Sequence, residues 1–150
     1  MPISFKNNWK NILEKLKSIL RTEFQGALPI YVGSINERVG SQYLRIDPIG
    51  SSLLRYDVTA ETREFSINIS YVFTGHNVKD SSLDHVLRYV SRVEALIHDN
   101  HAMILDKGAD ADSSNLLNCR MESCTLDNNE DESSYIAQWD FKCQHVANMS

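Results

Sequence analysis

The sequence predicts a soluble domain of the α+β class. Residues 9–24 and 83–97 place apolar residues three and four positions apart, which is the spacing of an amphipathic helix. Residues 64–73 alternate apolar and polar side chains, as does a strand with one buried face. The expected order is helix, three or four strands, helix, two strands, and such segregation is typical of α+β folds. The chain of 150 residues is long enough for one domain, residues 1–150, with a substantial core.

The first helix is expected over residues 9–24. Its apolar stripe consists of Trp9, Ile12, Leu13, Leu16, Ile19, Leu20 and Phe24. Asn7 or Asn8 is a suitable N-cap, and Gly26 is expected to close the helix. The opposite stripe is charged and consists of Lys10, Glu14, Lys17 and Arg21. A basic amphipathic helix can also lie on a membrane, but this apolar stripe is more typical of a core-facing helix.

Short strands and turns are expected after this helix. Residues 28–32 are extended, because Pro29 begins the piece and Gly33 ends it. Residues 34–41 are expected to form a loop or a weakly paired arm.

The middle of the chain is expected to hold three strands. A strand at residues 42–47 is expected to stop at Pro48 and Gly50, and another follows near residues 52–59. The clearest strand is residues 64–73, in which one face carries Phe65, Ile67, Ile69, Tyr71 and Phe73. Its other face has small polar side chains, which suits either solvent or close approach of another surface.

A second helix is expected after a turn at residues 75–77. Ser81 or Ser82 is the expected N-cap, and the helix is expected to end around residues 98–100. Its apolar stripe consists of Leu83, Val86, Leu87, Val90, Val93, Leu96 and Ile97.

The last third of the chain is expected to form a polar loop and a hairpin. The loop covers residues 106–115, and the two strands lie near residues 116–126 and 134–146. The acidic run at residues 127–132 is expected to be the loop between these strands. One face of the last strand carries Tyr135, Ala137, Trp139, Phe141 and Cys143.

Charge is unevenly distributed along the chain, whose net charge is −5. Residues 1–25 contain five basic and two acidic residues, whereas residues 99–140 contain ten acidic and two basic ones. Such asymmetry can guide head-to-tail association of identical subunits, and two separately solvated surfaces are the alternative. The acidity of the whole chain argues against a protein that reads DNA sequence, which needs a basic surface to neutralise phosphates.

The three cysteines, Cys119, Cys124 and Cys143, are expected to be free thiols. Their odd number indicates a reducing compartment, and the first ten residues lack the apolar block of a secretory signal. Four residues separate Cys119 from Cys124, which is not a zinc-ligand spacing.

No metal, cofactor or catalytic group is expected. His98 and His101 could place two imidazoles together at a helix end, but no third ligand stands at a recognised spacing. Asp106, Asp110 and Asp112 lack the glycine and the terminal glutamate of a calcium loop. The chain has no G-x-S-x-G, H-E-x-x-H, G-x-G-x-x-G or phosphate-loop motif. A non-enzymatic protein that acts through its surfaces is therefore expected.

The order of these elements and several strings resemble a known family. The helix at residues 9–24 leads into LPIYVG at residues 28–33 and QYLRI at residues 42–46. The long strand and the second helix follow, and a terminal pair of strands contains WDF at residues 139–141. Together these features resemble the small tail-terminator, tail-completion and neck proteins of long-tailed bacteriophages. The resemblance covers most of the chain and is one of layout, without an invariant motif.

The resemblance implies an α+β fold in which a mostly antiparallel sheet of about five to six strands carries two main helices packed on one face. It further implies a structural virion protein that forms a hexameric ring at the head-proximal end of the tail. Such a ring caps the tail tube and joins it to the neck or connector. The implied partners are other copies of the chain, the tail-tube protein and the head-side connector. Genomic DNA would pass through without specific binding, and the protein would reach the virion after synthesis in the host cytoplasm.

Contacts with subunits and partners are expected at three places. The first is the basic stripe of the first helix, with Lys10, Lys17 and Arg21. The second is the arm at residues 34–41, with Ile35, Glu37 and Arg38. The third is the acidic loop at residues 127–132, with Asp127, Glu130, Asp131 and Glu132. This loop could line a channel and repel passing DNA, or it could point outward.

Two alternatives stay open at this point. A tail-tube or head-completion protein would fit the same class. From another class, a small cytoplasmic enzyme or ligand-binding domain could use the region of His98 and His101. Stoichiometric metal in the purified protein would favour that second alternative.

Overall fold

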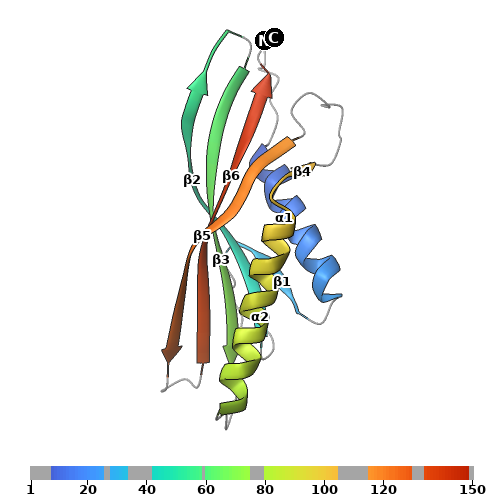
Figure 1. Ribbon diagram of the computed structural model, residues 1–150, viewed down its shortest axis with the longest axis vertical. Coiled ribbons are helices and arrows are strands. Elements are labelled where there is room, and N and C mark those ends of the chain that lie inside the picture. The colour runs from blue at the N-terminus through green and yellow to red at the C-terminus, as the bar shows by residue number, and fades with distance from the viewer. Residues whose placement is uncertain are drawn as a thin grey trace.

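The protein contains two helices and six strands in the ranges that its computed structural model describes (Figure 1). The described residues are 8–25, 28–33, 42–58, 60–74, 80–104, 115–129 and 134–148. The elements are α1 (Asn8–Phe24), β1 (Ile30–Val32), β2 (Gln42–Tyr56), β3 (Ala60–Thr74), α2 (Asp80–Asp99), β4 (Met103–Ile104), β5 (Asn115–Asn129) and β6 (Ser134–Asn148). The predicted α+β class is confirmed, and the two-residue strand β4 is an addition to the expected elements.

The strands form one sheet in the order β1-β2-β3-β6-β5-β4. Neighbouring strands are antiparallel except β1, which runs parallel to β2. The four strands β2, β3, β5 and β6 have 15 residues each, and the short β1 and β4 lie at the two edges. In Figure 1, β2 ends and β3 begins at the upper end of the molecule, whereas β5 ends and β6 begins at the lower end.

Both helices pack on the same face of the sheet, as predicted. The apolar stripe of α1 buries Ile12, Leu16, Leu20 and Phe24, and that of α2 buries Val86, Val90, Val93 and Ile97. They meet the inward side chains of the two central strands, which are Phe65, Ile67, Ile69 and Tyr71 from β3 and Ala137, Trp139, Phe141 and Cys143 from β6. The opposite face of the sheet carries no helix in the described part of the chain (Figure 1). On β3 this face is mostly polar, with Glu64, Ser66, Asn68 and Ser70.

Buried polar atoms at this helix–sheet interface have hydrogen-bond partners. The Trp139 Nε1–H donates to Glu94 Oε1 at 3.1 Å, and the Tyr71 hydroxyl donates to Gln42 Oε1 at 2.7 Å. Burial raises the pKa of Tyr71, so its hydroxyl stays protonated and continues to donate. These bonds remove the cost of burying the polar ends of two large aromatic side chains.

β2 is one long strand, whereas the sequence predicted two strands separated at Pro48 and Gly50. Proline lacks an N–H, so it fits a strand where that group would face away from a partner. On β2, the N–H of Leu44 points outward and donates to Pro29 O of the β1 segment at 2.9 Å. Alternation turns the nitrogen of Pro48 to the same side, beyond the end of β1. A bulge between Pro48 and Gly50 then lets the strand continue.

β5 contains a bulge that the sequence pattern did not reveal. Its register against β6 shifts between Leu117 and Arg120, and Asn118 has a φ of 52°. Asparagine tolerates this left-handed conformation better than most residues. The extra residue brings Cys119 onto the buried face, beside Cys143 of β6.

The predicted acidic loop begins later than expected. Asp127 lies in β5 opposite Ile136 of β6, because the antiparallel ladder continues to the pair Asn129–Ser134. Ladder hydrogen bonds thus outweigh the low strand propensity of Asp and Asn here. Residues 130–132 of the predicted loop lie outside the described residues.

α1 ends at Phe24, and Gln25 follows with a φ of 50°. The Gln25 N–H donates to Arg21 O at 2.8 Å, which closes the last turn. Gly26, which was expected to close the helix, lies outside the described residues, and so does the predicted turn at residues 75–77. Neither of the described helices is long and apolar enough to cross a membrane.

Candidate assembly surfaces

The first candidate surface is the outer edge of β2 beyond Pro48. β1 pairs only with Leu44, Arg45 and Ile46, so no described strand covers residues 49–56, which we call the β2 edge. This edge exposes large apolar side chains, and Ile49 is 66%, Leu53 50% and Tyr56 68% exposed. Unpaired strands in soluble proteins are usually protected by charged side chains or by proline. An apolar unpaired strand is suited to association with another chain.

The second candidate surface is the outer edge of β5. β4 pairs only with Asn115 and Leu116, and the Cys119 N–H donates to His101 O at 2.9 Å. Beyond that point no described strand covers residues 120–129, which we call the β5 edge. Its exposed side chains include Leu126. A hollow of about 470 Å³ lies between α2 and the start of this edge, and it is lined by Ser91, Glu94, Ala95, Ile97, His98, Cys119, Arg120 and Met121.

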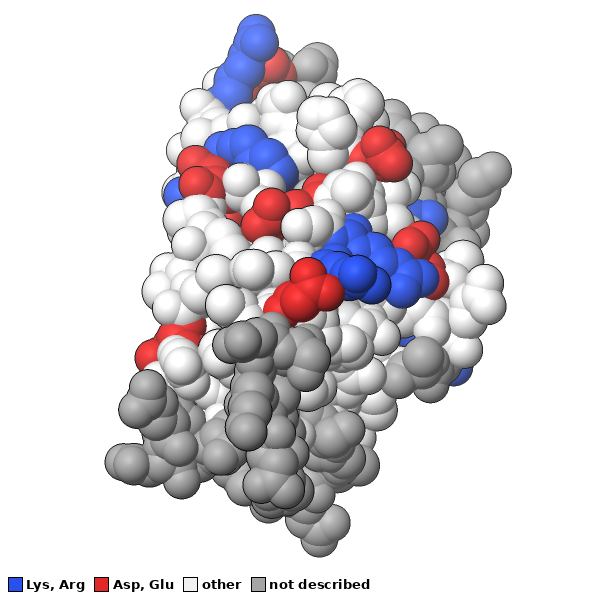
Figure 2. Space-filling model, turned by 60° about the horizontal axis from the view of Figure 1, so that its bottom comes forward, with Lys and Arg blue, Asp and Glu red and all other residues white. Residues whose placement is uncertain are grey.

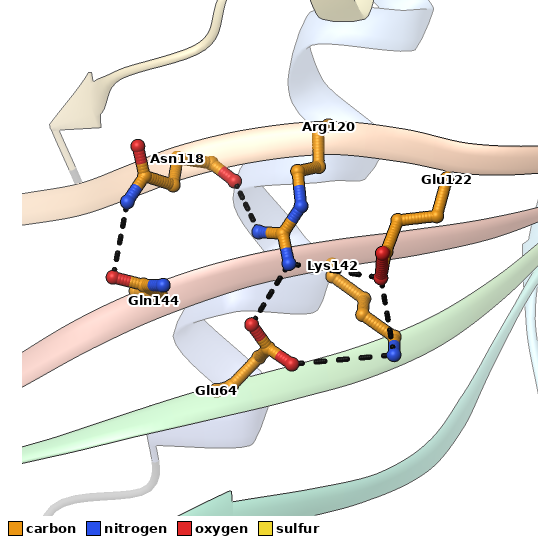
Figure 3. Close-up of polar contacts among 6 residues, drawn as sticks. All are labelled: Glu64, Asn118, Arg120, Glu122, Lys142 and Gln144. Carbon is orange, nitrogen blue, oxygen red and sulfur yellow. Dashed lines mark hydrogen bonds and ion pairs between the residues drawn. The ribbon is translucent and has the colours of Figure 1, made fainter. Parts of the chain in front are cut away.

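A ladder of charged residues crosses the face of the sheet that the helices leave uncovered (Figure 3). Arg120 of β5 donates from Nη2 to Glu64 Oε2 of β3 at 2.9 Å and from Nη1 to Asn118 O at 3.0 Å. Lys142 of β6 lies 3.1 Å from Glu122 and 4.0 Å from Glu64. The hydrogen bond from Arg120 and the nearby positive charges hold the pKa of Glu64 below its ordinary value, despite partial burial. The ladder joins β3, β6 and β5 and fixes their side chains on this face.

The predicted basic stripe on α1 is only partly exposed. Lys10 and Arg21 are exposed and Lys17 is half-buried. Lys10 lies 4.0 Å from Glu14, whereas Lys17 and Arg21 form no ion pair with any residue in the described ranges. Most other cations of the described chain are paired, and Figure 2 shows basic and acidic side chains next to one another on the face that it draws. Lys17 and Arg21 are therefore charges available to a partner.

The other predicted contact residues are only partly placed. Ile35, Glu37 and Arg38 of the arm, and Glu130, Asp131 and Glu132 of the acidic loop, lie outside the described residues. Asp127 is exposed on the β5 edge, and α1 lies on the helical face of the sheet. The structure therefore does not bring the described members of the predicted set into one site.

The histidines and cysteines form no metal centre within the described residues. His98 and His101 are exposed, and a ring nitrogen of His101 lies 3.3 Å from the carbonyl oxygen of His98. All three cysteines are free, with Cys119 and Cys143 buried and Cys124 exposed. The hydrogen bond with the adjacent Cys119 thiol, followed by burial, raises the pKa of Cys143, so it stays a neutral core thiol.

The sequence reasoning missed the β2 edge because it placed a strand end at Pro48. Residues 52–59 were expected to be a separate strand, so their apolar side chains were not read as an unpaired edge. The available signal was the non-alternating pair Leu53 and Leu54, followed by Tyr56 and Val58. Adjacent apolar residues in a strand place one side chain on each face, which is unusual unless both faces or the edge are covered.

Comparison with known proteins gives a match in three-dimensional structure and none in sequence. No protein-family model matches the chain, and no curated protein gives a significant match. The fold is similar to that of a chain in the solved structure described as the virion of a native gene transfer agent (GTA) particle. The match covers 92% of this chain and 93% of that chain, at 11% identity and a TM-score of 0.52. The two chains therefore share a fold over almost their whole lengths.

Proposed function

We propose that this protein is a structural component of a phage-type virion. The observation that carries the proposal is the shared fold over 92% of the chain with a chain of a virion particle. Two sheet edges that no described strand covers support it, as do the α1 cations Lys17 and Arg21, which have no ion-pair partner among the described residues, because these features suit association with other proteins.

In this proposal the chain forms a hexameric ring at the head-proximal end of the tail, caps the tail tube and joins it to the neck. Neighbouring subunits make head-to-tail contacts that close. The basic stripe with Lys10, Lys17 and Arg21 contacts the tube or the connector, together with the predicted arm and acidic loop. DNA passes through without specific binding, in keeping with a net charge of −5.

The test is the assembly state of the purified chain, measured by light scattering over a concentration series with and without a purified tail-tube protein from the same source. A discrete ring-sized species, seen by negative-stain electron microscopy at one end of the tubes, is the expected result. A monomer at every concentration that does not bind tubes would overturn the proposal. Long tubes formed by the chain alone would indicate a tail-tube protein instead, and binding only to filled heads would indicate a head-completion protein.

A further inference from the structure

We propose that copies of this chain associate by continuing the sheet, so that the β2 edge (residues 49–56) of one copy pairs with the β5 edge (residues 120–129) of the next. This inference deepens the proposed function by naming the contact between subunits, and it rests on the self-association that the proposed function requires.

Both edges have backbone N–H and C=O groups that can form hydrogen bonds with another strand. On β2, residues that bond to β1 alternate with residues that bond to β3, and Pro48 is the first outward position without a partner among the described residues. At the far end of the strand, the Asp57 N–H donates inward to Ala60 O at 2.9 Å. Between these points, outward N–H and C=O groups of the β2 edge have no strand opposite them in the described chain. The same holds for β5 beyond the bond from Cys119 to His101.

The strand directions allow every copy to point the same way. β2, β3, β6 and β5 alternate in direction, so the two outer strands of this even-numbered set run antiparallel. A second copy placed beside the first in the same orientation therefore presents β5 antiparallel to β2. Each copy uses a different edge on each side, which is the head-to-tail contact that generates rings.

The side chains of the two edges are complementary. The β2 edge carries one charged residue, Arg55, which lies 3.9 Å from Asp57. The β5 edge carries the carboxylates Glu122 and Asp127 and one cation, Arg120. Glu122 already lies 3.1 Å from Lys142, and Arg120 is bound to Glu64, so the edge remains acidic overall. When the two segments are aligned about their centres, Arg55 faces Glu122 and Leu53 faces Cys124. Pairing two β2 edges with each other would leave the β5 edge and its carboxylates uncovered.

The positions of β1 and β4 set a stagger between copies. They cover diagonally opposite corners of the sheet, so the centres of the two free edges lie about six residues apart along the strands. Each copy is displaced from the next by six residues of about 3.3 Å along the strands, and it is four strands of about 4.8 Å wide. These two lengths are nearly equal, so the strands of a closed ring are inclined by about 45° to the ring axis. This inclination does not depend on the number of copies, and strands in closed barrels tilt by roughly 35–45°.

The edges also contain bulges, at Ile49 and Leu54 in β2 and around Asn118 and Glu122 in β5. Bulges can protect an edge, but they also supply the curvature that a sheet needs in order to close. An unpaired edge strand that is protected from association usually also carries charged side chains. Ile49 and Leu54, at the bulges of β2, are instead apolar and exposed. The bulges of this protein therefore fit a curved, shared sheet.

The test uses the exposed native Cys124 as one half of a cross-link. Ser52→Cys, Leu53→Cys and Leu54→Cys are each made in the full chain and incubated with oxidised glutathione, which accepts the electrons of thiol–disulfide exchange. The incubation is run at mildly alkaline pH, because partial burial and Glu94 raise the pKa of Cys124. At least one variant should give a ladder of dimers, trimers and larger species on non-reducing gels. The ladder should vanish when Cys124→Ser is added.

The matched control is Leu87→Cys, at an exposed leucine of α2 outside both edges. It reports random collisions and should give no ladder. If the variants gave only dimers, and these dimers persisted when Cys124→Ser was added, two β2 edges would be paired with each other. This result would overturn the inference. A wild-type-like gel for all three variants would overturn it as well.

A second pair of variants separates this inference from the proposed function. Leu53→Lys should raise the concentration needed for half-assembly by about tenfold or more, whereas Leu87→Lys should leave it unchanged. Rings that form and cap tubes equally well with Leu53→Lys would overturn the edge contact and leave the proposed function standing. Head-to-tail ladders from a chain that never binds tubes would support the edge contact and overturn the proposed function.

Discussion

Glu64 holds the charged ladder together, because it accepts from Arg120 and also faces Lys142. Its side chain is only 16% exposed, so the loss of its charge would leave two cations on β5 and β6 partly uncompensated. Most surface ion pairs contribute little to stability. A charge-assisted hydrogen bond in a half-buried ladder contributes more.

We expect Glu64→Gln to lower the free energy of unfolding by about 1 kcal/mol at neutral pH. The pKa of Glu64 is lowered in the folded protein, so its contribution is fully present above the ordinary value of 4.5 and is lost as the pH falls through the folded value. The difference between wild type and Glu64→Gln should therefore shrink in urea unfolding experiments below pH 4.5.

The control for this prediction is Glu122→Gln in the same ladder. Glu122 is 37% exposed and lies nearest to Lys142, so its substitution should change stability by less than about 0.5 kcal/mol. A difference between wild type and Glu64→Gln that stays constant down to acid pH would contradict the role given to the Glu64 charge.

Lys17 and Arg21 are expected to act on a partner rather than on the fold. The double variant Lys17→Glu/Arg21→Glu should weaken binding to tail tubes, measured by co-sedimentation, while light scattering shows the same self-assembly as wild type. Arg88→Glu on α2 provides a charge-reversed control at an exposed site. Unchanged tube binding by the double variant would remove the α1 stripe from the proposed contact.

At the scale of the element, the C-terminal end of α1 gives a clear prediction. Gln25 adopts a left-handed conformation that costs a residue with a Cβ more than it costs glycine. We expect Gln25→Gly to raise the free energy of unfolding by about 0.5–1 kcal/mol, measured by thermal or urea unfolding. Gln25→Ala keeps the Cβ and should give no such gain, and equal effects of the two variants would argue against conformational strain at this position.

Elements with one buried face could be predicted from the sequence. α1, α2 and β3 each pack a regular apolar stripe against a single core, so their periods of three to four and of two are visible in the residues. β2 and β5 could be read only in part, because half of each strand has no neighbour on one side among the described strands. There, Pro48 and Asp127 occupy positions that a strand paired on both sides would disfavour, and Asn118 lies in a bulge just before the unpaired part of β5.

The candidate surfaces were harder to predict than the fold. Charges on the polar side of α1, such as Lys17 and Arg21, can be found from the helical period, because they lie opposite the apolar stripe. An unpaired edge depends on which strand ends beside it, and this is set by the lengths of β1 and β4. Those lengths follow from long-range pairing, which local patterns do not encode.

At the scale of the whole molecule, the sheet predicts a gradient of amide protection. β3 and β6 have strands on both sides along most of their length, so their amides should exchange slowest with deuterium. Outward amides of residues 49–56 and 120–129 should exchange fast in the monomer. They should become protected on assembly if the edges pair, as measured by hydrogen exchange of the monomer and the ring. Protection confined to α1 would place the contact elsewhere.

The first turn of α1 and the last residues of β6 lie close together. Trp9 packs edge-on against Phe65 at 4.7 Å between ring centroids, and Phe65 is opposite Cys143 and near His145 of β6. The start of α1 and the end of β6 thus meet beside the same core residue. The two ends could be joined by a short linker and the chain reopened between β5 and β6, giving a circular permutant with every strand neighbour retained. Its order of synthesis would change, while the native architecture would not.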